Sequence, residues 1–458
     1  MDVVFWQWLL LTAFGIAFLK FGPSAKTVKH FFEGTSTKGK QPNFVMLTSS
    51  LIISWIFAKS ITNAANLSLS FGMVGAVAYA TYYGSFVVAG IIIYQLRTQG
   101  GFQSLHHFLQ HKYGRGAVYL FSILVGFRLF NEVWSNTMVI GSYFGAPGST
   151  NYIGAVLVFT TLTLLYTLKG GMSSSIFTDA IQMIFFGVLL FIILGIILPQ
   201  SEFEFSSYVA SGTWSMSTGL NLFFVALIQI FSYPFHDAVL TDRGFLSDPK
   251  TTLKSFLWAS VIGFICIVLF GFVGVHAKLL GLEGQAAVEV GKVLGVGMML
   301  LMNFIMITSA ASTLDSAFTS GAKLFVKDLM IFEKVTVSKG RLAMLAFAVL
   351  GTLPIFLNPT ILSATTISGI MVQGLAPVFL LWKMKSRPIA FHLSVGVGMV
   401  IGITLALGFW PAVFIFFEGK YGDLLSANLI GTILCFLCYI LGSINSNERT
   451  ADYSVGRN

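Results

Sequence analysis

Long apolar runs recur along the whole chain, and they constrain its fold more than any other feature. A helix needs about 20 apolar residues to cross a bilayer. Thirteen segments approach or exceed this length, at about 3–22, 44–71, 73–96, 117–145, 151–168, 172–199, 217–240, 252–280, 290–324, 338–358, 360–384, 388–410 and 423–444. The alternating pattern of a membrane β-barrel is absent. The sequence therefore predicts an all-α polytopic membrane protein.

The composition excludes several other classes. Only 10% of the residues are charged, whereas a soluble domain carries roughly 25%. Soluble enzymes and nucleic-acid-binding proteins are therefore excluded, and no nucleic-acid partner is expected. The chain has no Ser–His–Asp arrangement, phosphate loop or clustered His motif, so we expect no enzyme activity and no organic cofactor. The first apolar segment lacks a small-residue cleavage site, so we expect it to be retained as an extra N-terminal helix over 1–22.

The basic residues are distributed unevenly between the two sets of loops. Of the 27 Lys and Arg, 22 fall in one alternating set, only Lys278, Lys292 and Lys420 fall in the other, and Lys59 and Arg128 lie inside spans. Loops rich in Lys and Arg stay in the cytoplasm. The pattern predicts an integral protein of the plasma (inner) membrane, with its N-terminus outside and its C-terminus in the cytoplasm.

Ionisable residues inside the spans are few, and each is a functional candidate because charge is expensive at membrane depth. Arg128 and Glu132 lie four residues apart on one helix face. They can form an intrahelical ion pair, or one of them can face a cavity. Lys59 has no acid within four residues. It therefore needs a partner from another helix, a water-filled cavity or a bound anion.

Two runs of five spans start on opposite sides of the membrane, which is typical of an inverted repeat. The first covers 44–199 and the second 217–384, followed by two peripheral helices and a short tail over 388–458. In such folds the first helix of each repeat is broken near the midplane. Pro234 predicts the break in the second repeat. The segment 44–71 has no Gly or Pro, so its break is expected only from its many Ser and Asn residues.

The segment 290–324 carries a row of hydroxyls that includes Thr308, Ser309 and Ser312. Small hydroxyl residues are common where membrane helices pack closely, but they are also oxygen ligands for a hard cation. Asp179 lies about as deep in its span as Ser312 does. An acid and hydroxyls at one depth on two helices favour a cation site or a proton relay.

Several motifs, in order along the chain, resemble those of the sodium:solute symporter family. They are FFEG at 31–34, KGGMSSSIFTDAIQ at 169–182, DRGFLSDPK at 242–250 and TSAASTLDS at 308–316. The segment SWIFAKSITNAANLSLSFG at 54–72 is most similar to the urea active transporter branch. The resemblance implies a LeuT-like core of 5+5 inverted helices and symport of a small solute with sodium, the only coupling ion expected.

The resemblance also implies ion ligands. The main sodium site would use the backbone carbonyls of Ile53, Ile56 and Ile305 with the hydroxyls of Thr308 and Ser309. A second cation position, present in some members, would involve Asp179 and Ser312; here a neighbouring hydroxyl position is Ala311. Lys59 departs from the family pattern, in which this position is small and uncharged.

We therefore expect a sodium-coupled carrier of a small polar organic solute, an amide, amino acid or carboxylate, working by alternating access. The candidate solute-binding residues are Trp55, Lys59, Ser60, Asn63, Arg128, Asn131, Glu132, Gln229, His236 and Asp237. Lys59 can hold an anionic group of the solute or act as an internal cation. The alternatives are thus a proton-coupled or uncoupled carrier with Lys59 replacing the ion, and a transporter-like solute sensor. The expected partners are the solute, sodium and the lipid bilayer; the sequence predicts no oligomeric state.

Overall fold

The computed structural model describes residues 3–36, 39–200, 203–357 and 368–444, and all regular structure within these ranges is helical. Ten apolar helices are long enough to cross a membrane, or eleven if α3 and α4, which meet at 56°, form one bent span. The expected all-helical, polytopic fold is confirmed. The long elements are α1 Val3–Phe21, α3 Phe44–Trp55, α4 Ala58–Phe71, α5 Met73–Ala80, α6 Gly84–Thr98, α8 Arg115–Ser142, α9 Thr150–Gly170, α10 Met172–Gln200, α14 Pro249–Leu279, α16 Val296–Lys323, α17 Val337–Thr352, α20 Pro388–Ala406 and α21 Gly422–Ser443.

Shorter elements connect or interrupt these helices. They are α2 Val28–Glu33, η1 Thr81–Tyr83, α7 Leu105–Tyr113, α11 Phe205–Val209, η2 Met216–Thr218, α12 Leu220–Gln229, η3 Tyr233–His236, α13 Ala238–Arg243, α15 Ala286–Val293, η4 Leu324–Asp328, η5 Leu353–Leu357, α19 Leu375–Leu380 and η6 Ala412–Phe414. Three of them, α12, η3 and α13, together replace one expected span. The second expected broken helix is therefore confirmed, with Pro234 inside the interruption.

The expected count of thirteen spans is not confirmed. The segment 217–240 contains no single helix long enough to cross, and 360–384 lies partly outside the described residues. The segment 290–324 divides at Gly295, which has φ +87° and separates α15 from α16. Left-handed backbone of this kind ends a helix, and glycine adopts it without a steric penalty.

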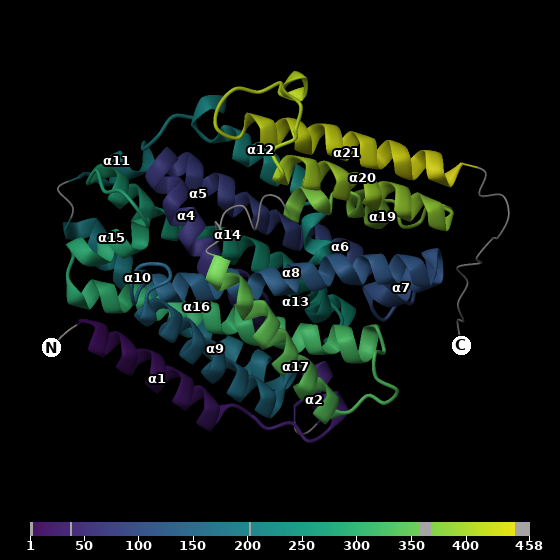
Figure 1. Cartoon of the computed structure of the whole chain (residues 1–458), viewed down its shortest axis with the longest axis horizontal. Helices are drawn as coiled ribbons and strands as arrows, with labels where there is room; N and C mark the ends of the chain where they lie inside the picture. Colours follow the sequence, from purple (N-terminus) through teal and green to yellow (C-terminus); the bar gives the residue numbers. More distant parts are fainter. Residues whose placement is uncertain (1–2, 37–38, 201–202, 358–367, 445–458) are drawn as a thin grey trace.

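The helices form a layered bundle in which α1 lies along one edge and α20 and α21 lie along the opposite edge (Figure 1). Between these edges, α4 packs against α14, and α16 packs against both α8 and α10. The approach of α4 to α14 depends on Gly274, because a Cβ built there would lie 1.9 Å from the backbone oxygen of Ala65. Small residues permit such close contact between membrane helices. This contact fixes the position of α4.

Candidate functional site

The first broken helix is interrupted between α3 and α4, which confirms the break expected in 44–71. The amide of Lys59 donates to Asn136 Oδ1 at 3.1 Å instead of closing the helical turn back to Trp55. The oxygen of Trp55 accepts from Tyr83 Oη at 2.8 Å. Side chains from neighbouring helices thus replace the missing helical hydrogen bonds, as they must in an apolar surrounding.

The break between α3 and α4 lies beside an unusual stretch of α16, which packs against both helices. No backbone hydrogen bond crosses the break to the oxygens of Ile53 and Ile56, and α3 packs against α16. On α16, Thr308 and Ser309 are fully buried, and neither hydroxyl has a hydrogen-bond partner among the residues that the structure describes. A buried hydroxyl without a partner costs about 1–3 kcal/mol. Two adjacent ones, with Ile305 one turn before them, make a set of oxygens suited to a bound cation.

Four buried charges form a continuous chain beside the two breaks. Lys59 Nζ lies 2.7 Å from Glu132 Oε1, and Arg128 forms an ion pair with the same carboxylate. Arg128 Nη2 also lies 3.0 Å from Asp237 Oδ2, which accepts from Trp55 Nε1 at 2.9 Å. The expected intrahelical pair of Arg128 and Glu132 is confirmed. The partner that Lys59 requires is an acid on another helix, and the two positive charges balance the two negative ones.

A small cavity lies next to this chain of charges and is walled almost entirely by aromatic rings. Its volume is about 10 Å³, which leaves room for about one water molecule. Its lining residues come from both broken helices and from the α5–α6 segment: Trp55, Phe57, Ser60, Tyr79, Tyr82, Tyr83 and Tyr233. A solute of several heavy atoms therefore enters only if some of these rings move.

The remaining residues expected to bind solute are all buried, but they do not converge on one point. Gln229 donates to Asn428 Oδ1 at 2.8 Å and accepts from Tyr82 Oη at 2.7 Å, which ties it to α21. His236 Nδ1 contacts the oxygen of Tyr233 at 2.6 Å, and its Nε2 is buried without a partner. Ser60 lines the aromatic cavity and accepts from Tyr79 Oη at 3.2 Å, while Asn63 and Asn131 are buried on α4 and α8.

Asp179 and Ser312 lie together, as their equal depth predicts, in a second buried cluster. Ser312 Oγ donates to Asp179 Oδ1 at 2.5 Å, and Ser50 Oγ donates to Oδ2 at 2.5 Å. Arg243 Nη2 lies 2.9 Å from the same Oδ2. Arg243 is one of the 22 basic residues that the charge pattern assigns to loops. This assignment is wrong, because Arg243 is the last residue of α13 and its side chain is fully buried. The short helix α13 continues the interrupted helix and packs against α3 and α16, which places Arg243 inside the bundle.

Asp315, on the next turn of α16, has a different environment. Its carboxylate accepts from Tyr166 Oη at 2.8 Å, Ser175 Oγ at 2.7 Å and Thr178 Oγ1 at 3.0 Å. Within the described residues, no Lys, Arg or His forms an ion pair with it. The hydroxyls come from α9 and α10, so this carboxylate joins three helices.

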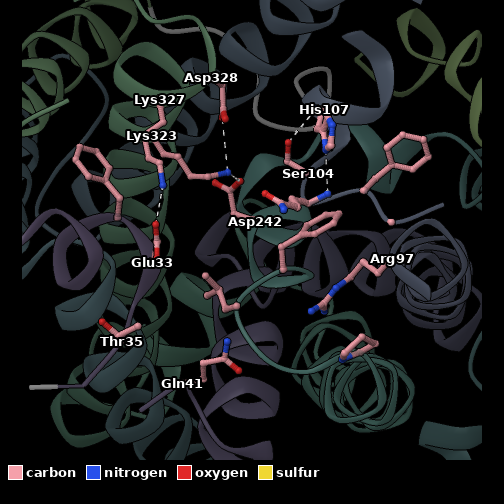
Figure 2. Close-up of a pocket in the computed structure, with 17 residues that line it drawn as sticks. Glu33, Thr35, Gln41, Arg97, Ser104, His107, Asp242, Lys323, Lys327 and Asp328 are labelled. Carbon is pink, nitrogen blue, oxygen red and sulfur yellow. Dashed lines mark hydrogen bonds and ion pairs between the residues drawn. The ribbon is translucent and has the colours of Figure 1, made fainter. Parts of the chain in front are cut away.

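A larger cavity has a volume of about 730 Å³, and Figure 2 shows the residues that line it. Two ion pairs join residues of its lining: Lys327 Nζ lies 2.9 Å from Glu33 Oε1, and Lys323 pairs with Asp242. Arg97 also lines it. The cavity lies where α2, α6, α13 and α16 end, so it is separate from the aromatic cavity at the breaks.

No family model and no curated protein matches the chain. In solved structures it is similar to a Na⁺-coupled sialic acid symporter in a substrate-bound outward-open state, with TM-score 0.70 and 14% identity, covering 97% of this chain and 96% of that one. It is also similar to Mhp1, a nucleobase-cation-symport-1 family transporter, in a closed conformation with bromovinylhydantoin bound (TM-score 0.55, 15% identity, 92% and 95% covered). A third similar structure is MhsT in complex with L-phenylalanine (TM-score 0.56, 15% identity, 87% and 97% covered). The chain therefore has the LeuT-like fold that these proteins share.

Proposed function

We propose that this chain is a secondary transporter of the sodium:solute symporter family, which carries a small polar organic solute together with sodium by alternating access. The segments 44–199 and 217–384 are its two inverted repeats. The observation that carries the proposal is a pair of buried hydroxyls on α16, those of Thr308 and Ser309, which have no hydrogen-bond partner among the described residues. Their helix packs against both halves of the broken α3–α4 helix. The same fold serves Na⁺ coupling in a similar structure.

In this proposal sodium binds between the carbonyls of Ile53, Ile56 and Ile305 and the hydroxyls of Thr308 and Ser309. The ion links α3 to α16 and thereby stabilises one conformation of the bundle. The solute binds at the aromatic cavity beside the breaks. Coupling requires only that sodium and solute favour the same conformation, since each then raises the affinity for the other.

The pairing of charges narrows the class of solute. Lys59 and Arg128 are both neutralised by Glu132 and Asp237, so neither offers an unpaired charge to a carboxylate. We therefore favour a neutral amide-like solute, held by Trp55, Ser60 and the tyrosines of the cavity. The same pairing removes the main support for a carrier in which Lys59 replaces the ion, because its ammonium is directed to α8.

In this proposal the end of the bundle that carries the loops rich in Lys and Arg faces the cytoplasm. The cavity lined by Arg97, Lys323 and Lys327 is then the route by which sodium and solute leave. The ion pairs Lys327–Glu33 and Lys323–Asp242, which join residues of its lining, close that route.

Sodium is expected to stabilise the purified protein against heat, and Ser309→Ala to abolish this effect. A ligand that binds only the folded state stabilises it by mass action, by about 2.7 kcal/mol at 100 times its Kd. The measurement is the melting temperature in NaCl and in matched choline chloride. Ser320→Ala is the control, because Ser320 is another buried hydroxyl of α16 without a partner. A wild-type melting temperature that is equal in both salts contradicts the proposal.

A further inference from the structure

The cluster around Asp179 has the composition of a cation site. A buried carboxylate and three hydroxyls, those of Ser50, Ser312 and Ser316, come from α3, α10 and α16. Oxygen ligands from several helices, buried in an apolar surrounding, are what a hard monovalent cation requires. An ionised carboxylate cannot stay unpaired at such a place, because an isolated buried charge is very costly.

In this chain the place of the cation is taken by a side chain. Arg243 Nη2 lies 2.9 Å from Asp179 Oδ2 and donates to Ser316 Oγ at 2.7 Å. Its Nε donates to Ser50 Oγ at 2.6 Å, and its Nη1 donates to the oxygen of Val239 at 2.8 Å. Every nitrogen of the guanidinium is thus engaged. The side chain is fully buried, so its charge is not in contact with solvent.

A second positive charge at this carboxylate would meet strong repulsion. Like charges a few ångströms apart repel far more in a protein interior than in water. The hydroxyls that a metal ion would need are also occupied, since Ser50 and Ser316 both contact the guanidinium. The cluster is therefore saturated by a cation that belongs to the chain.

We propose that Arg243 is a resident cation of the Asp179 cluster, so that the protein binds no sodium there, and that removal of this guanidinium converts the cluster into a sodium site. The cluster is distinct from the Thr308–Ser309 site. The resulting count of one sodium ion per chain, and the use of Ser309→Ala as a background without sodium binding, rest on the proposed function.

Three variants test the proposal through sodium-dependent melting in NaCl against choline chloride. Ser309→Ala alone is expected to show no response to sodium. Arg243→Gln combined with Ser309→Ala is expected to respond again, because Asp179 is left without a cation. Adding Asp179→Asn to that pair is expected to abolish the response. A folded Arg243→Gln/Ser309→Ala protein that melts at the same temperature in both salts overturns the proposal.

Equilibrium binding of radioactive sodium to the wild-type protein provides a test that needs no variant to fold. One ion per chain is expected, and two ions per chain would overturn the proposal. If no sodium binds to the wild-type protein, the proposed sodium coupling fails, whereas Arg243 as the resident cation is upheld. The two failures are therefore distinguishable.

Discussion

Replacing Glu132 by Gln is expected to destabilise the protein by about 3–5 kcal/mol, because breaking a buried ion pair leaves a charge without compensation. Glu132 is the acid that pairs with both Lys59 and Arg128. Arg128 retains Asp237 at 3.0 Å, but Lys59 forms no other ion pair within the described residues. Its side chain is fully buried. The measurement is the free energy of unfolding in detergent, or the melting temperature where unfolding is irreversible.

Two variants show whether this effect comes from the charge. Lys59→Met/Glu132→Gln removes one charge of each sign and is expected to recover most of the lost stability. Glu289→Gln breaks an ion pair of 2.8 Å whose lysine side chain is 59% exposed, and exposed pairs contribute only about 0–1 kcal/mol. If Glu132→Gln is no less stable than Glu289→Gln, the four charges do not depend on one another as we infer.

Gly274→Ala is expected to lower the stability of the protein more than any other Gly→Ala substitution in α14. Its Cβ would lie 1.9 Å from the backbone oxygen of Ala65 on α4. Overpacking a core typically costs about 1–3 kcal/mol, and here a helix backbone, rather than a flexible side chain, has to move. Displacing α4 also displaces Lys59 and Ser60. Loss of monodisperse protein in size-exclusion chromatography, or a markedly lower melting temperature, is the expected result.

The matched control is Gly187→Ala on α10, where an added Cβ meets nothing within 4 Å. Both substitutions replace a glycine by alanine in a helix and so gain the same helix propensity, up to about 1 kcal/mol. Any difference between the two therefore reports packing. Equal melting temperatures for the two variants would show that α4 and α14 do not approach as closely as described.

Much of the fold could be predicted from the sequence. The length of an apolar run indicates a membrane-spanning helix, and both this length and the Lys and Arg content of a loop can be read from neighbouring residues alone. The break in 44–71 could also be predicted, since Ser and Asn residues that face lipid would be unsatisfied. The proximity of Asp179 and Ser312 followed from depth alone, because helices crossing one bilayer share one depth scale. The division of 290–324 was missed, although Gly295 provided a signal that a helix could end there.

Two features of the candidate site were beyond reach of the sequence for a physical reason. The pairing of Lys59 with Glu132 joins residues 73 positions apart, and it depends on which faces of α4 and α8 meet. Arg243 stands at the end of a span, where arginine is usually a topology signal. Its charge is buried because the short helix α13 packs against α3 and α16. Register between helices is a tertiary property that no local pattern determines.

The chain of charges from Lys59 to Asp237 also has a mechanical consequence. The attraction within a buried ion pair falls as its atoms separate, and water is not there to compensate. Sliding α4 or η3 along α8 would stretch these contacts, whereas tilting about them would not. The chain of charges therefore acts as a pivot that restrains translation and permits rotation. We therefore expect a change of conformation near the helix breaks to turn about Arg128 and Glu132.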